Sequence, residues 1–280
     1  MTYDASLSNN SYKLYNISKD ILHDVDGLLY PFNPSWKRIG VNVSGGADSA
    51  LGTAILAELI EKNDTGTEIH FITHVRNWKT KPWASYISIE VYEKIKEMFP
   101  SVKMYRHQNF IPLEIEHGNL LGINEEGVIA GLGISGDVLC VNTFSDYVAN
   151  FYNLEAVYNF ITNNPTDIVH EWAPQGRSWN ESLVISAERC PQIGEFLIQP
   201  WKLVTKDFII GQYYKKGWHD LLNITRSCET DVKKFPNHFF DYSAYKHGLT
   251  PLMTCCDVTK DKDKWCYWCA EREWAKDQLK

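Results

Sequence analysis

The first residues that could do chemistry lie in a glycine turn of this 280-residue sequence, between a predicted strand and a predicted helix. Alternating apolar residues predict a short buried strand at 38–43, Ser-Gly-Gly-Ala-Asp-Ser interrupts it, and residues 50–60 carry apolar side chains at helical spacing. Glycines in such a turn let the backbone come close to a ligand. Unpaired N–H groups and the helix dipole favour an anion there. The residues predicted to bind phosphate are Ser44, Gly45, Gly46 and Ser49.

Asp48 is the unexpected member of this loop, because a carboxylate repels phosphate. It could cap the helix, or it could hold Mg²⁺ that bridges to the phosphates. The loop has neither the lysine of Gly-x-x-x-x-Gly-Lys-Ser/Thr nor the spacing of Gly-x-Gly-x-x-Gly. It resembles instead the PP-loop of the N-type ATP pyrophosphatases, which implies that ATP is cleaved between its α and β phosphates. The alternative is an ordinary strand–helix turn with a Ser/Asp cap.

Composition narrows the function classes. Hydrophobic residues make up 44% of the chain, which is normal for a globular core. A net charge of −7 argues against a large nucleic-acid footprint, so a nucleic-acid partner is not expected. Residues 1–20 lack the apolar core of a signal peptide, and no apolar run of ~18 residues exists, so we expect a cytoplasmic protein without a membrane span.

The order of the predicted elements indicates an α/β fold, a Rossmann-like parallel sheet flanked by helices. We divide the chain into an N-terminal lead-in at 1–37, a nucleotide-binding domain at 38–224 and a cysteine-rich segment at 225–280. The pattern predicts helices at 17–29 and 85–99 and strands at 68–75 and 102–106. It also predicts a strand with a glycine-rich turn at 127–137. A further strand, turn and helix follow at 196–216, and the N-cap of this helix is Thr205 and its end is marked by Gly217.

Two groups of residues should join the loop at the carboxyl edge of the sheet. His74, with Arg76 and Asn77, ends the second strand and could contact adenine or ribose, or could be polar loop residues. Gly131 and Gly133 would form a wall of the nucleotide pocket, or a plain glycine-rich loop. Aromatic residues between 147 and 160 predict a helix that packs in the core or forms a homodimer interface, and 170–180 could be a mobile lid.

Five of the seven cysteines lie at positions 228–269, which suggests metal binding rather than disulfides in a cytosolic-looking chain. Cys266-Tyr-Trp-Cys269 is a Cys-x-x-Cys knuckle that leads into a C-terminal helix. Four thiolates make a closed structural zinc site. A redox pair and buried free thiols are the alternatives. We take Cys228, Cys256, Cys266 and Cys269 as the ligands, with Cys255 as the alternative to Cys256.

Three blocks together resemble the 7-cyano-7-deazaguanine synthase family of PP-loop enzymes, whose fold is of the adenine nucleotide alpha hydrolase type. The blocks are Ser44–Ser49, the Pro-x-x-x-Leu-(Ser/Thr)-Lys-x-x-Ile-like segment 200–210, and Thr225-Arg-Ser-Cys228 with Cys266-x-x-Cys269-x-Glu-Arg272. The cysteine spacing is expanded here. Gly133-Ile-Ser-Gly-Asp137 replaces a substrate-recognition stretch of the family, so the substrate stays open.

The resemblance implies that a substrate carboxylate, on a deazapurine, attacks the α-phosphate of ATP·Mg²⁺ and that ammonia then displaces AMP. The product would be an amide or, after a second round, a nitrile. Asp48, Lys206 and Arg226 are the candidate catalytic residues, although Lys206 and Arg226 could also be an ordinary surface lysine and a salt-bridged arginine. The competing functions are a tRNA-modifying PP-loop enzyme, a 3′-phosphoadenylylsulfate-reductase-like protein and a non-catalytic nucleotide-binding defence or scaffold protein.

Overall fold

A five-stranded, wholly parallel sheet forms the centre of the computed structural model, which describes residues 22–25, 28–75, 84–110, 136–165, 167–168, 197–201, 204–228, 255–258 and 261–280. The strand order is β5-β4-β3-β6-β7. The bounds are Arg38–Asn42 for β3, Glu68–Val75 for β4, Met104–Phe110 for β5, Ala156–Asn159 for β6 and Leu197–Ile198 for β7. The predicted α/β fold with a parallel sheet is therefore confirmed.

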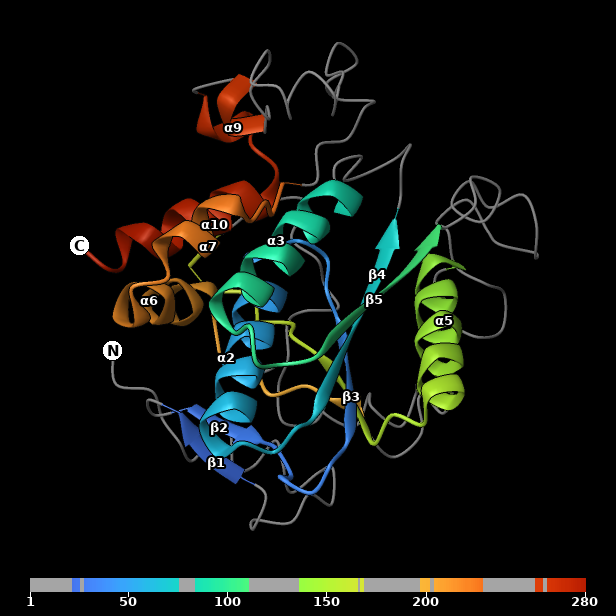
Figure 1. The fold of residues 1–280 in the computed structure, drawn as a ribbon. Helices are drawn as coiled ribbons and strands as arrows, with labels where there is room; N and C mark the ends of the chain where they lie inside the picture. The colour runs from blue at the N-terminus through green and yellow to red at the C-terminus, as the bar shows by residue number, and fades with distance from the viewer. Residues whose placement is uncertain are drawn as a thin grey trace.

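Helices cover both faces of this sheet (Figure 1). On one face lie α2 and α3, with α6, α7 and α10 packed outside them, whereas α5 alone covers the other face among the described helices. Their bounds are Ala47–Asn63 for α2, Ala84–Met98 for α3, Gly136–Tyr152 for α5, Lys206–Lys216 for α6, His219–Ile224 for α7 and Tyr267–Asp277 for α10. No helix in the described ranges is long and apolar enough to cross a membrane.

The central strand β3 is the point where the order of the strands reverses. It pairs with β4 on one side and with β6 on the other, both in parallel. Loops that leave the carboxyl ends of two strands separate at such a point and open the crevice in which α/β folds bind ligands. The turn after β3 is Ser44–Ser49, so the fold places the predicted phosphate loop at this crevice.

Two predicted elements were wrong. The described backbone between 22 and 31 forms an antiparallel hairpin of β1 (Leu22–Val25) and β2 (Leu28–Pro31), not part of a helix at 17–29. Asp26-Gly27 is a two-residue hairpin signal that the helical spacing obscured. The aromatic helix α5 ends at Tyr152, so Tyr158 and Phe160 lie on or just after β6 instead. Tyr147 and Phe151 remain on α5, where both are exposed.

The described part of the C-terminal segment packs into the same core as residues 38–224. α10 lies against α6, and Cys228, Cys255, Cys266, Cys269 and Ala275 belong to the hydrophobic cluster that includes the buried face of α2. Residues 225–280 are thus described only in part, but what is described is not a separate layer.

A pair of stacked histidines joins β4 to β5 under α5. His70 is 2% exposed, and its Nδ1 lies 2.9 Å from Nε2 of His107, with the rings nearly parallel. Tyr105 and Tyr152 pack on the same pair. Burial, and then repulsion from His107, lower the pKa of His70 from 6.5 to about 4, and burial also lowers the pKa of His107.

We expect the free energy of unfolding to fall as the pH drops from about 6.5 towards about 4. In this range the two histidines bind protons more readily in the unfolded chain than in the folded chain. His70→Phe keeps an aromatic ring on β4 and removes one of these groups, so its stability should depend less on pH across this window. Urea unfolding at a series of pH values measures the slope. His219→Phe, on the exposed surface of α7, is the control. Equal slopes for the wild type and His70→Phe would contradict this prediction.

Candidate functional site

The loop Ser44–Ser49 holds its shape through its own hydroxyl groups. The backbone N–H of Ser44 donates to Oγ of Ser49 (3.2 Å), and the N–H of Gly46 donates to Oγ of Ser44 (3.3 Å). Gly45 has φ +77°, and a Cβ there would meet the side chain of Ile87 at 3.0 Å. Gly46 is the N-cap of α2. The loop is therefore a tight turn that places backbone amides at a helix N-terminus, as a phosphate site requires.

Asp48 does not cap the helix. Both of its carboxylate oxygens lie 2.6 Å from Nζ of Lys206, the first residue of α6, and Thr162 donates to Oδ2 at 3.4 Å. Lys206 is 2% exposed. The interpretation of Lys206 as an ordinary surface lysine is wrong, because its ammonium lies buried against the loop.

A second carboxylate shares this ammonium. Oε2 of Glu271, on α10, lies 3.7 Å from Nζ of Lys206, and Glu271 is wholly buried. Tyr267, one helical turn earlier, donates to Oδ1 of Asn164 at 3.0 Å and lies 3.5 Å from Oε1 of Glu271. One buried lysine therefore connects the loop to the helix that follows the cysteine knuckle. Sequence reasoning did not select Glu271, although it stands in the quoted Cys-x-x-Cys-x-Glu-Arg block.

Arg226 contacts the loop through its backbone. Its N–H donates to the carbonyl of Gly45 at 3.0 Å, so the Thr225–Cys228 segment runs beside the glycine turn. Its guanidinium Nη1 donates to the carbonyl of Thr225 at 2.8 Å, which turns part of the group back onto its own segment. Arg272 supports the same segment through hydrogen bonds to the carbonyls of Thr225 and Leu222. Within the described residues, neither arginine pairs with a carboxylate.

His74 lies at the carboxyl end of β4, as predicted. Its Nε2 is 3.4 Å from Oγ of Ser145, which donates to Oδ1 of Asn42 at the end of β3 (2.9 Å). Its ring packs edge-on against Phe144. The histidine is thus held beside the crevice by α5. Arg76, Asn77, Gly131, Gly133 and residues 170–180 lie outside the described residues.

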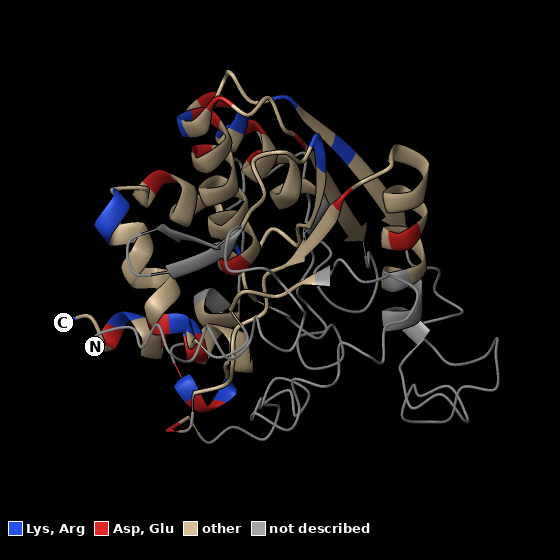
Figure 2. Ribbon diagram, turned by 90° about the horizontal axis from the view of Figure 1, so that it is seen from below, with Lys and Arg blue, Asp and Glu red and all other residues tan. Residues whose placement is uncertain are grey.

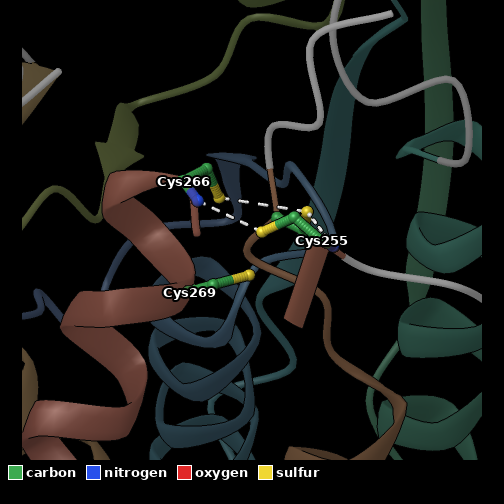
Figure 3. Close-up of side chains that lie close together, drawn as sticks. Cys255, Cys266 and Cys269 are labelled. Carbon is green, nitrogen blue, oxygen red and sulfur yellow. Dashed lines mark hydrogen bonds between the residues drawn. The ribbon is translucent and has the colours of Figure 1, made fainter. Parts of the chain in front are cut away.

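Four cysteines come together from separate parts of the C-terminal segment. The sulfur atoms of Cys228, Cys255, Cys266 and Cys269 all lie within 4.8 Å of one another, and all four residues are buried. Figure 3 shows three of them around a common space. Cys228 follows α7, Cys255 opens the short helix α9 (Cys255–Val258), Cys266 is the N-cap of α10, and Cys269 lies in its first turn.

The fourth member of this group is Cys255, and our choice of Cys256 was wrong. The backbone N–H of Cys255 donates to Sγ of Cys228 (3.3 Å), and the N–H of Cys266 donates to Sγ of Cys255 (3.1 Å). Cys256 is only half-buried. Successive residues of a helix point about 100° apart, so the two neighbouring cysteines are oriented differently, and Cys255 is the one whose sulfur lies among the four.

The spacing of the sulfur atoms fits a single tetrahedral ion. With Zn–S bonds of about 2.3 Å, a tetrahedron separates its ligands by roughly 3.8 Å. Sγ of Cys266 lies 3.9 Å from Sγ of Cys228. Neighbouring thiols, together with burial, raise the pKa values of Cys228 and Cys269, so four thiolates need a cation to balance them. The residues present therefore fit a single tetrahedral metal ion such as zinc.

Comparisons with known proteins give little further identification. No family model matches the chain, and no curated protein matches it. Among solved structures, the chain is similar to the U34-tRNA thiolase NcsA from Methanococcus maripaludis with its [4Fe-4S] cluster, at 12% sequence identity and a TM-score of 0.40, over 98% of this chain and 78% of that one. So distant a likeness identifies neither the family nor the reaction of this chain.

Proposed function

We propose that the chain binds ATP at Ser44–Ser49 and uses it to adenylate a carboxylate, with release of pyrophosphate. The acid is of the 7-deazaguanine type, and ammonia displaces AMP from the acyl adenylate to give an amide or, after a second activation, a nitrile. The observation that carries this proposal is the ion pair between the buried Lys206 and Asp48 of a glycine loop, at the reversal point of a parallel sheet.

The residues divide the work as follows. Backbone amides of the loop and the N-terminus of α2 bind the phosphates. Lys206 supplies beside the loop the cation that a P-loop enzyme carries within it. Asp48 is the carboxylate that could hold Mg²⁺, which supplies charge neutralisation on the phosphates when bound. Because Lys206 also lies beside Glu271, it keeps a carboxylate partner when Asp48 binds Mg²⁺ instead.

The cysteine group has a structural role in this proposal. A zinc ion held by four thiolates has no open position for a substrate. It would fix Cys266 and Cys269 at the start of α10, and α10 carries Glu271 to Lys206. The metal therefore acts on the reaction only through the position of that helix.

Product analysis tests the proposal. The protein is incubated with ATP, ammonium and 7-carboxy-7-deazaguanine, and the nucleotides are separated by chromatography. We expect AMP and pyrophosphate, formed only with the acid present. ADP as the main product would contradict the proposal. A parallel incubation with transfer RNA tests the competing tRNA-modifying function. On the described elements, Lys and Arg are interspersed with Asp and Glu (Figure 2).

Asp48→Asn should reduce AMP formation by about 10²- to 10³-fold while the protein stays folded. The variant loses the carboxylate that could hold Mg²⁺, but Lys206 keeps Glu271 as its partner. Asp64→Asn makes the same change at the other end of α2, where asparagine tolerates the left-handed backbone (φ 48°), and should leave the rate unchanged. An Asp48→Asn protein with full, Mg²⁺-dependent activity would refute the role of this carboxylate.

A further inference from the structure

A cavity of about 320 Å³ opens beside the cysteine group, between the Asn223–Cys228 segment and α10. Its walls include the basic residues Arg226, Arg272 and Lys276, together with Ser227, Trp265 and Glu273. This volume lies at the lower end of the range for small-molecule sites. Nothing in the function proposed above uses this cavity.

The positive charges of the cavity are only partly balanced. Oε2 of Glu273 lies 3.7 Å from Nζ of Lys276, so the charges of these two residues balance each other. Nη1 of Arg226 donates only to backbone carbonyls, and its other nitrogens have no hydrogen-bond partner in the described part of the chain. Burial, and then repulsion from Arg226, lower the pKa of Arg272, so the two guanidinium groups oppose each other. The cavity thus offers unused donors on a fixed, forked cation, a geometry that matches a carboxylate.

A second observation points to a ligand. Ser227 lines the cavity, is 8% exposed, and its hydroxyl oxygen is buried with no hydrogen-bond partner among the residues described. Buried hydroxyl groups are nearly always hydrogen-bonded, so this one calls for a partner from outside the described chain. A zinc ion with four thiolates carries net negative charge and explains how two guanidinium groups are tolerated. Cys228 and Cys269, two of its ligands, also line the cavity, but a metal ion offers no hydrogen-bond acceptor to the hydroxyl of Ser227.

The position of the cavity relates it to the loop. Arg226 forms part of the cavity wall, and its backbone N–H is bonded to Gly45 of the phosphate loop. A molecule held against Arg226 would therefore lie next to the segment that contacts the predicted phosphate loop. Trp265 supplies an aromatic wall on which a planar ring can pack.

We propose that this cavity is the binding site for the acid, a planar heteroaromatic carboxylate recognised by the guanidinium of Arg226 and the hydroxyl of Ser227, with its ring against Trp265. This inference rests on the proposed function, because that function is the reason to choose a carboxylic acid among the anions that the cavity could bind. It adds the site of the acid, which the adenylation chemistry alone does not place.

Steady-state kinetics of AMP formation provide the first test. Ser227→Ala and Arg226→Lys should each raise KM for 7-carboxy-7-deazaguanine by about tenfold or more, because each removes a hydrogen bond to a charged group. KM for ATP should change less than about twofold. Lys94→Gln, on α3 and paired with Glu97, is the control and should change neither constant. An unchanged KM for the acid in both variants would overturn the cavity assignment and leave the proposed function intact.

Binding without turnover provides the second test. Ligand-observed NMR without ATP should detect 7-carboxy-7-deazaguanine on the wild type. The signal should weaken with Ser227→Ala and with 7-deazaguanine, which lacks the carboxylate. If this pattern holds but no acid yields AMP, the cavity assignment stands and the proposed function fails. No binding to the wild type, or equal binding of the two compounds, would overturn the assignment.

Discussion

Cys255→Ser is expected to remove the metal from the purified protein and to lower its melting temperature by at least about 10 °C, whereas Cys256→Ser should do neither. The two residues are adjacent, yet only Cys255 has its sulfur among the four that lie within 4.8 Å of one another. Metal binding requires the folded arrangement of ligands, so the free energy of binding adds to the free energy of unfolding. Loss of one thiolate should forfeit much of that contribution.

Elemental analysis and calorimetry measure these effects directly. Wild-type protein and Cys256→Ser should each contain about one zinc per chain, as one tetrahedral site requires. Cys255→Ser should contain close to none, and a strong chelator should shift the wild-type melting temperature towards that of Cys255→Ser. The reverse outcome, with metal lost in Cys256→Ser alone, would restore Cys256 as the ligand. If the wild type contained no metal and the chelator left its melting temperature unchanged, the four cysteines would be inert buried thiols.

Lys206→Met should abolish AMP formation and destabilise the fold by about 3–5 kcal/mol. The substitution leaves two carboxylates, Asp48 and the wholly buried Glu271, without the ammonium that lies 2.6 Å and 3.7 Å from them. Removing one partner of a buried ion pair exposes the full cost of burying the other. Urea unfolding measures the stability, and pyrophosphate release measures the activity.

A double substitution separates these two effects. In Lys206→Met, Glu271→Gln one of the unpaired carboxylates is neutral, so about 1–3 kcal/mol of stability should return, while activity stays absent because the cation beside the loop is still missing. Lys216→Met is the matched control on the same helix. Lys216 makes an equally short ion pair, 2.6 Å to Glu58, but the Glu58 side chain is 35% exposed, so we expect at most about 1 kcal/mol. Recovery of activity in the double variant would mean that Lys206 serves only the fold.

Much of the architecture follows from local sequence. The strand and the helix between 38 and 63 can be predicted because each has its own apolar periodicity, and the glycines mark the turn between them. Helix α6 can be predicted because Thr205 and Gly217 mark its ends. The hairpin at 22–31 was missed because its apolar residues also fit a helix, and Asp26-Gly27 was the stronger signal. The choice between Cys255 and Cys256 depends on the orientation of a four-residue helix, which spacing alone does not provide.

The buried charge network could not be predicted in the same way. Lys206 was singled out from its sequence block, but its partner Asp48 lies 158 residues away, and Glu271 comes from the last helix described. No periodicity relates such positions. They meet because α10 packs on α6, and α6 packs on α2, around one hydrophobic core. The cavity beside the cysteines likewise arises only when the Asn223–Cys228 segment and α10 are folded together.

The place of Glu271 on α10 has a consequence for synthesis of the protein in the cell. A ribosome makes the phosphate loop early and Glu271 roughly 220 residues later, which at typical elongation rates takes roughly 10–40 s. Throughout that time the nascent chain lacks Glu271, the second carboxylate beside Lys206, and the last two cysteines of the metal group. Under the proposed function, the growing chain carries its predicted phosphate loop before Glu271 is made, and we expect it to become competent for ATP chemistry only after α10 has been translated.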